Sequence, residues 1–298
     1  MRALAKVMIR LAKILIPVDF SDNSLLAIRD AATLGRRFRS ELMLLHVNEL
    51  TILHSRNGPL GYGIAPPGAV RPDYMEQRRQ RLQTFGVEET GGLTVKRCVL
   101  CGDAARIIVD RAQAEGVDLI VMPTHGYGPV RRLLLGSVTA KVLHDSDHPV
   151  WTSRPASEAA RDISHVRHVM CAVNFRANDA KIIRWAAGLA AKFGATLTLA
   201  HAILPAPPEM PERYAFTWHD EARWGADERL RSLLRELEIP AEVLVIEGDA
   251  PIALGTAAKE RGVDVLVIGR SQATNMIGRL GSHTYGIICH TPCPVVSL

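Results

Sequence analysis

Two segments in the first half of the chain carry residues suited to binding an anion. Asp19 ends the apolar run ILIPVD, and the run VDLIVM leads into a loop that contains Gly126, Gly136, Ser137 and Thr139. Backbone N–H groups at a helix N-terminus bind anions when glycines leave them open to approach, and the two hydroxyls add donors. The pattern therefore predicts an anion site where a helix begins near residue 137.

The spacing of apolar residues indicates which elements position these groups. Five short apolar runs alternate with segments of helical period in the first half, in the order KILIPVD, ELMLLHV, TVKRCVL, VDLIVM and HPVWT. This alternation is typical of βαβ units around a parallel sheet with helices on both faces. In such a doubly wound sheet, ligands bind beyond the carboxyl ends of the strands, where Asp19 and the loop of Gly136 are both expected.

The second half of the chain repeats the pattern of the first. Asp19 is matched 155 residues later by Asn174, and Gly136 is matched 145 residues later by Gly281. So long a period indicates duplicated domains rather than a solenoid of short repeats. We therefore expect two tandem doubly wound α/β domains, each with a five-stranded parallel sheet, at residues 1–153 and 166–298 with a polar linker near 153–165.

These residues resemble the universal stress protein family, and the likeness extends over both halves. Its ATP-binding members carry an Asp at the end of the first strand and a loop of the form G-x-x-G-x9-G-[S/T] after the fourth strand. Gly126, the nine residues that follow it, Gly136 and Ser137 match the second part of this loop, whereas Pro123 replaces its first glycine. The fold that the resemblance implies is adenine-nucleotide α-hydrolase-like.

The resemblance also implies an adenine-nucleotide site in the first half, with ATP as the ligand, with or without Mg²⁺. Asp19 would face the adenine or ribose end, and the glycine loop would supply amides and hydroxyls to the phosphates and ribose. The residues that the resemblance assigns to this site are Pro17, Asp19, Val47, Met122, Gly126, Gly136, Ser137, Val138 and Thr139.

The second half departs from this pattern. Gly269 keeps the first glycine of the loop, but Asn174 stands in the place of the acid and Gln272 stands in the place of the second glycine. Asn keeps a hydrogen-bond acceptor without the charge, and a glutamine side chain obstructs close backbone approach. We therefore expect a degenerate domain with a weak or absent nucleotide site.

The implied function is regulatory binding of ATP in a stress response or in signalling. The sequence contains neither a G-x-x-x-x-G-K-[ST] loop nor a G-x-S-x-G elbow, so slow ATP hydrolysis is the most that we expect. One alternative is an adenylyl-transferring enzyme of related fold, although H-x-G-H and S-G-G-x-D-S motifs are absent. The other is a nucleotide-free interaction module, which Pro123 favours because proline has no N–H and cannot adopt a positive φ.

Several of these residues also have purely structural interpretations. Asp19 within DFSDNS and Gly136-Ser137 are suited to capping the helices that follow them. His46 and His201 end apolar strands without an acid or nucleophile at a recognisable spacing, which favours a structural role. For Arg131 and Arg132, contact with phosphates and a place on a solvated helix face are both open. Cys98 and Cys101 form a single C-x-x-C motif without further ligands nearby, and we do not expect them to bind a metal.

The composition indicates a cytoplasmic globular protein. Apolar residues make up 47% and charged residues 22% of the 298 residues, and no apolar run approaches the roughly 20 residues that a membrane span needs. The net charge of +5 owes much to four cations near the N-terminus, which lacks the apolar core of a secretory signal. We expect no membrane span and no specific nucleic-acid partner.

Two features predict how the domains associate and how the site is covered. The apolar last strands, HPVWT and CPVVSL, would be exposed edges, so we expect them to pair with each other as an intrachain pseudo-dimer. Whether two chains also form a homodimer is left open by the sequence. The stretch from about His54 to Pro72 is rich in Gly and Pro, and its length predicts a lid over the site.

Overall fold

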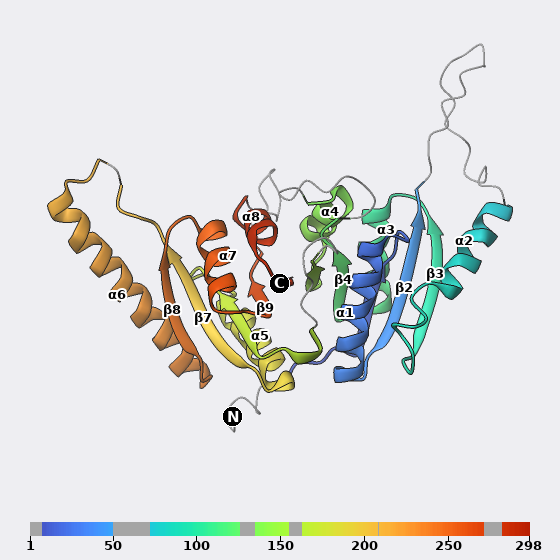
Figure 1. Cartoon of the computed structure of the whole chain (residues 1–298), viewed down its shortest axis with the longest axis horizontal. Helices are drawn as coiled ribbons and strands as arrows, with labels where there is room; N and C mark the ends of the chain where they lie inside the picture. Colours follow the sequence, from blue (N-terminus) through green and yellow to red (C-terminus); the bar gives the residue numbers. More distant parts are fainter. Residues whose placement is uncertain (1–7, 50–71, 126–134, 155–162, 208, 271–281) are drawn as a thin grey trace, which may run out of the picture.

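The structure is a computed structural model that describes residues 8–49, 72–125, 135–154, 163–207, 209–270 and 282–298. In these ranges ten strands form one continuous sheet, in the order β3-β2-β1-β4-β5-β10-β9-β6-β7-β8 (Figure 1). The first five strands belong to the first half of the chain and the last five to the second half. Each half has the same strand order, read outward from the middle of the sheet.

The elements of the first domain alternate between strand and helix. They are β1 (Lys13–Pro17), α1 (Asp22–Phe38), β2 (Glu41–Asn48), α2 (Pro72–Thr84), β3 (Val95–Cys101), α3 (Ala104–Glu115), β4 (Leu119–Pro123), α4 (Ser137–Asp145) and β5 (Val150–Ser153).

The second domain repeats this alternation after a short 3-10 turn, η2 (Ile163–His165). Its elements are β6 (His168–Ala172), α5 (Asp179–Phe193), β7 (Thr196–Ile203), α6 (Glu212–Leu237), β8 (Glu242–Glu247), α7 (Ala250–Glu260), β9 (Val265–Ile268), α8 (Ser282–His290) and β10 (Val295–Ser297).

Helices cover both faces of the sheet, as the apolar runs of the strands predict. A hydrophobic core lies on each face of the sheet. Within β1, Ile14 and Ile16 pack into the core that includes α1 and α5, whereas Leu15 packs into the core that includes α3, α4, α7 and α8. All three side chains are fully buried. A strand covered on both faces must be apolar throughout, so the uninterrupted run ILI follows from its place in the middle of a parallel sheet. The predicted fold class is confirmed.

The two domains are joined where β5 pairs antiparallel with β10. Val295 lies opposite Thr152, and Val296 lies opposite Trp151. Trp151 is fully buried, and its indole N–H donates a hydrogen bond to Asp30 Oδ2 in α1 at 3.0 Å. The last strand of each domain thus covers the edge of the other, which confirms the intrachain pairing predicted from HPVWT and CPVVSL.

Other expectations fall partly outside the described residues. The proposed lid from His54 lies outside them, apart from Pro72 at the start of α2, and so do Arg131 and Arg132.

No helix of the described chain is both long enough and apolar enough to span a membrane. The described residues contain no group of three His, Cys, Asp or Glu side chains placed to hold a metal ion, and Cys101 instead contacts the Met75 sulfur at 3.2 Å.

Candidate functional site

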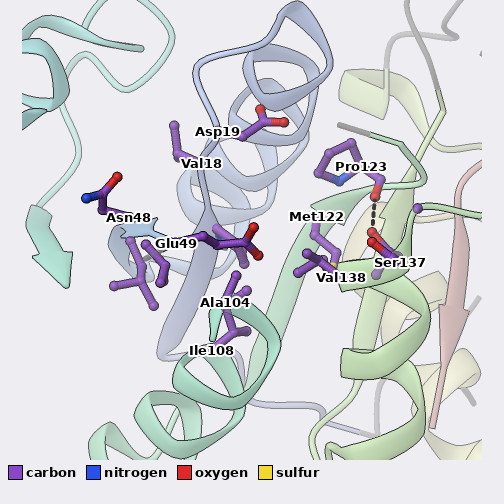
Figure 2. A pocket seen from close by; sticks show the side chains of 15 residues that line it. Val18, Asp19, Asn48, Glu49, Ala104, Ile108, Met122, Pro123, Ser137 and Val138 are labelled. Atoms are coloured by element: carbon purple, nitrogen blue, oxygen red, sulfur yellow. Dashed lines mark hydrogen bonds between the residues drawn. The ribbon is translucent and has the colours of Figure 1, made fainter. Parts of the chain in front are cut away.

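A pocket of about 450 Å³ opens at the carboxyl ends of β1 and β4, between α3 and α4 (Figure 2). It gathers residues from three strand ends, those of β1, β2 and β4, and from the starts of α3 and α4. Eight of the nine residues expected at the site line it, and the ninth, Gly126, lies outside the described residues. These eight are Pro17, Asp19, Val47, Met122, Gly136, Ser137, Val138 and Thr139.

Asp19 lies two residues beyond β1 and is held by the start of α1. Its Oδ1 accepts hydrogen bonds from Ser21 Oγ, from Ser24 Oγ and from the Ser21 backbone N–H. Ser21, rather than Asp19, is the N-cap of α1, because Ser21 Oγ accepts from the Ser24 N–H at 3.1 Å. The serines therefore fix the orientation of the carboxylate at the pocket wall.

The first turn of α4 forms the opposite wall. Gly136 is the N-cap residue, and within the described residues no side chain caps the helix. The backbone N–H groups of an uncapped first turn have no acceptor inside the helix, so those of residues 137–139 are available to a ligand that carries negative charge. Gly136 packs closely against the end of β4: its N–H donates to Thr124 O at 2.8 Å, and a Cβ would lie 3.3 Å from that oxygen.

The two hydroxyls of this turn differ in what they do. Thr139 is buried, and its Oγ1 donates a hydrogen bond to Pro123 O at 3.0 Å, which ties α4 to β4. Ser137 is exposed at the pocket. Thr139 thus contributes its backbone to the pocket, whereas the Ser137 hydroxyl is placed to meet a ligand directly.

Pro123 fits the end of β4 without strain. It pairs with Ser153 in the sheet, and it is not among the described residues with positive φ. Its carbonyl accepts from Thr139. The glycine of the family pattern is therefore replaced here by a residue in ordinary strand conformation, and the loop does not need a left-handed residue at this position.

The pocket also has lining residues that the sequence did not predict. They are Val18, Leu45, Asn48, Glu49, Ala104, Ile108 and Pro123. Ala104 and Ile108 come from α3, whose N-cap Asp103 accepts from the Arg106 N–H at 2.9 Å. The signal was present in the sequence, because Gly102-Asp103 follows the third strand and the third helix must therefore begin at the same edge of the sheet.

His46 is buried and His201 is half-buried, each near the end of its strand. His46 Nδ1–H donates to Val18 O at 2.7 Å, and His201 Nδ1–H donates to Val173 O at 2.8 Å. Burial lowers the pKa of both imidazoles, although these hydrogen bonds act in the opposite direction. Each ring also contacts a phenylalanine ring in a tilted arrangement, with centroids 4.4 Å apart for His46 and 4.3 Å apart for His201, so the geometry agrees with the structural role expected of them.

The corresponding pocket of the second domain is smaller, about 140 Å³. Asn174 and Gly269 line it, together with Asp179, Thr284 and Ile287. Asp179 is only 2% exposed, and its Oδ2 accepts from the Arg176 N–H at 3.0 Å. Burial raises the pKa of Asp179, against the lowering effect of nearby backbone N–H groups. Gln272 and Gly281 lie outside the described residues.

Comparison with known proteins gives the family. The model of the universal stress protein family matches residues 11–154 and again residues 165–297. The chain belongs to the universal stress protein family. Because the match occurs twice and covers most of the chain, this protein is a tandem member with two universal stress protein domains. A stress-related role follows from its place in the family.

Relatives include single-domain and two-domain universal stress proteins. One from Methanocaldococcus jannaschii is 30% identical over 148 residues, which are 46% of this chain and 91% of the relative. The universal stress protein YxiE of Bacillus subtilis is 28% identical over 146 residues, 48% of this chain and 98% of that protein. A solved universal stress protein from Archaeoglobus fulgidus matches 98% of this chain and 97% of its own, with a TM-score of 0.69 at 20% identity, so the two-domain fold is shared.

Proposed function

We propose that this universal stress protein is a regulatory ATP-binding protein whose first domain binds one nucleotide. The observation that carries the proposal is the first-domain pocket, which the Asp19 carboxylate and the uncapped N-terminus of α4 line together with apolar residues. A carboxylate accepts hydrogen bonds from hydroxyl groups, and an open helix start attracts phosphates. A nucleotide offers both groups, because its ribose carries hydroxyls beside the phosphates.

The pocket suits an adenine nucleotide in size and in lining. Its volume of about 450 Å³ lies within the range of roughly 300–1,000 Å³ usual for small-molecule sites. Val47, Met122 and Ile108 offer apolar contact to a base, while Asp19 lies where ribose hydroxyls would reach it. Any Mg²⁺ would be held chiefly by the phosphates, with the Glu49 carboxylate and the Ser137 hydroxyl among the side-chain oxygens that line the pocket.

Binding rather than turnover is the function that this lining supports best. Among the described residues that line the pocket, Asp19 and Glu49 are the ionisable side chains. The serines hold Asp19 through its Oδ1, an arrangement suited to positioning a ligand. We infer that the bound state itself is the signal, and that any hydrolysis is slow.

Native mass spectrometry of the full chain with ATP tests the proposal. We expect the mass of one ATP to add to the chain, and GTP at equal concentration to add less. Ser137→Asp places a negative charge in the anion site while favouring the start of the helix, so this variant should lose the adduct. His165→Asp, on an exposed residue outside the pocket, should keep it. A wild-type chain that takes up no ATP at millimolar concentration would support a nucleotide-free interaction module instead.

A further inference from the structure

The second domain touches the loop that leads into the first-domain site. The backbone N–H of Leu135 donates a hydrogen bond to Tyr285 Oη at 2.8 Å, across 150 residues of sequence. Leu135 directly precedes Gly136, the N-cap of α4, and it is buried. Tyr285 belongs to the first half of α8, which also lines the second-domain pocket through Thr284 and Ile287. One helix thus supports both sites.

The hydroxyl of Tyr285 is held by the Leu135 N–H, which donates to Oη at 2.8 Å. Burial raises the pKa of the Cys289 thiol, one helical turn farther along α8, and the nearby Tyr285 hydroxyl acts in the opposite direction. The contact with Leu135 is therefore the one that holds the Tyr285 hydroxyl against the residue preceding α4.

The other end of α4 is held by the same domain. Arg270, which lies two residues beyond β9 and is buried, donates through Nη1 to Leu143 O at 2.9 Å and through Nη2 to His148 O. Leu143 belongs to the last turn of α4. The helix that carries the phosphate-binding turn is consequently fixed at its start by Tyr285 and near its end by Arg270.

The tyrosine contact has no counterpart at the matching position of the first domain, although Arg154 of the first domain donates through Nη1 to Ile288 O in α8 at 3.5 Å. Tyr285 lies four residues after Gly281, and the residue four positions after Gly136 is Ala140. Alanine has no side-chain group that could hold the loop of the other domain in the same way. The domain that receives the tyrosine contact is therefore the one with the larger pocket and with Asp19 at its wall.

We propose that Tyr285 is a positioning residue for the phosphate end of the first-domain site, so that the second domain completes a site it does not itself line. This inference rests on the proposed ATP binding. The start of α4 has no side-chain cap within the described residues, so the Leu135 hydrogen bond is an anchor immediately before it. Loss of the anchor lets the turn shift, and a shifted turn aligns its N–H groups less well with phosphates.

The position of the contact predicts a selective effect. Tyr285 acts on the turn that would meet the phosphates, and the residues around the expected base position belong to β1, β2, β4 and α3. Removing the hydroxyl should therefore weaken ATP binding while leaving adenosine binding unchanged. A merely structural role would weaken both ligands together or neither.

Calorimetric titration of the full chain with ATP and with adenosine tests this. Tyr285→Phe keeps the ring and removes the hydroxyl, so we expect ATP affinity to fall about 5-fold to 10-fold, the effect of one lost hydrogen bond, with adenosine affinity within about 2-fold. Tyr214→Phe, on an exposed residue of α6, should match the wild type for both ligands.

Two results would overturn the inference while leaving the proposed function intact. One is a Tyr285→Phe protein that binds ATP as tightly as the wild type, and the other is an equal loss of ATP and adenosine affinity. A wild-type chain that binds neither ligand would instead overturn the proposed function, and this inference with it. Thermal unfolding of each variant checks that the fold is kept before any affinity is compared.

Discussion

The carboxylates of Asp19 and Asp179 lie at two positions that are five residues apart in each domain, Asp19 at the first position of the first domain and Asp179 at the second position of the second domain. In the first domain the acid follows the strand, and Ser24, five residues later in α1, donates to it. In the second domain Asn174 follows the strand, and the acid is Asp179, five residues later at the start of α5. Both domains thus have a carboxylate at the pocket, but that of Asp179 is nearly fully buried.

Asp19→Asn gives the first domain the residue that the second domain has at this position. Asn still accepts hydrogen bonds from Ser21 and Ser24, so the loop should keep its shape. The charge that would bind the ribose hydroxyls is lost, and we expect ATP affinity to fall about 10-fold to 100-fold, as for one hydrogen bond to a charged group. Calorimetric titration measures this. Asp22→Asn, an exposed neighbour that does not line the pocket, is the control, and an equal loss in both variants would refute a specific role for Asp19.

Asp179→Asn should change how stability depends on pH. Because burial raises the folded-state pKa of Asp179, the carboxyl costs stability as pH rises from the unfolded value of about 3.9 through the folded-state pKa. The Asn variant should therefore be more stable than the wild type at pH 7, and this advantage should shrink as pH falls toward 4. Urea unfolding at several pH values checks this. A variant that is less stable at pH 7 would show that the ionised carboxylate is needed.

His46→Gln tests a group whose folded-state pKa is lowered, so that its contribution to stability depends on pH in the opposite direction to that of Asp179. Burial lowers the folded-state pKa of His46, so its neutral form contributes stability above the unfolded value near 6.5, and this contribution is lost as pH falls below 6.5. We expect the wild type to lose stability between pH 7.5 and 5.5, by at most about 1.4 kcal/mol per pH unit for this group. His46→Gln should lose less over the same interval. His165→Gln, at an exposed position, should behave like the wild type, and so would His46→Gln if its imidazole were irrelevant.

Arg270→Ala tests the contact between the domains. Its guanidinium donates to two carbonyl oxygens of the first domain, and without it these buried acceptors lose their partner. We expect a loss of about 2–4 kcal/mol in the free energy of unfolding, the usual scale for charged hydrogen bonds that are broken inside a protein. Chemical denaturation measures it. Arg235→Ala, which breaks an exposed ion pair with Glu228, should cost under about 1 kcal/mol, and equal costs would contradict the importance of the buried contact.

The sequence predicts the fold and one wall of the pocket well, for physical reasons. Strands that are buried on both faces are apolar throughout, so β1 and β4 are visible as runs, and the edge rule for doubly wound sheets then brings Asp19 and Gly136 together. The edge pairing of β5 with β10 is also predictable, because both strands are apolar and would otherwise be exposed.

Contacts that depend on how the two domains dock are not predictable in this way. Tyr285 and Leu135 are 150 residues apart, and nothing in their local pattern indicates that they meet. The different position of the acid in the two domains could be predicted from the sequence, because the offset that relates Asp19 to Asn174 also relates Ser24 to Asp179. The reduced size of the second pocket, in contrast, depends on side-chain packing that periodicity does not describe.

Calorimetric titration of the full-length wild-type chain with ATP is the most direct test of the central claim. The first domain combines the acid, the larger pocket and the open helix start, whereas the second domain has Asn174 and a pocket of about 140 Å³. We predict a stoichiometry of one ATP per chain, abolished or strongly weakened by Asp19→Asn. Two equivalent sites, or no binding at millimolar ATP, would contradict the account.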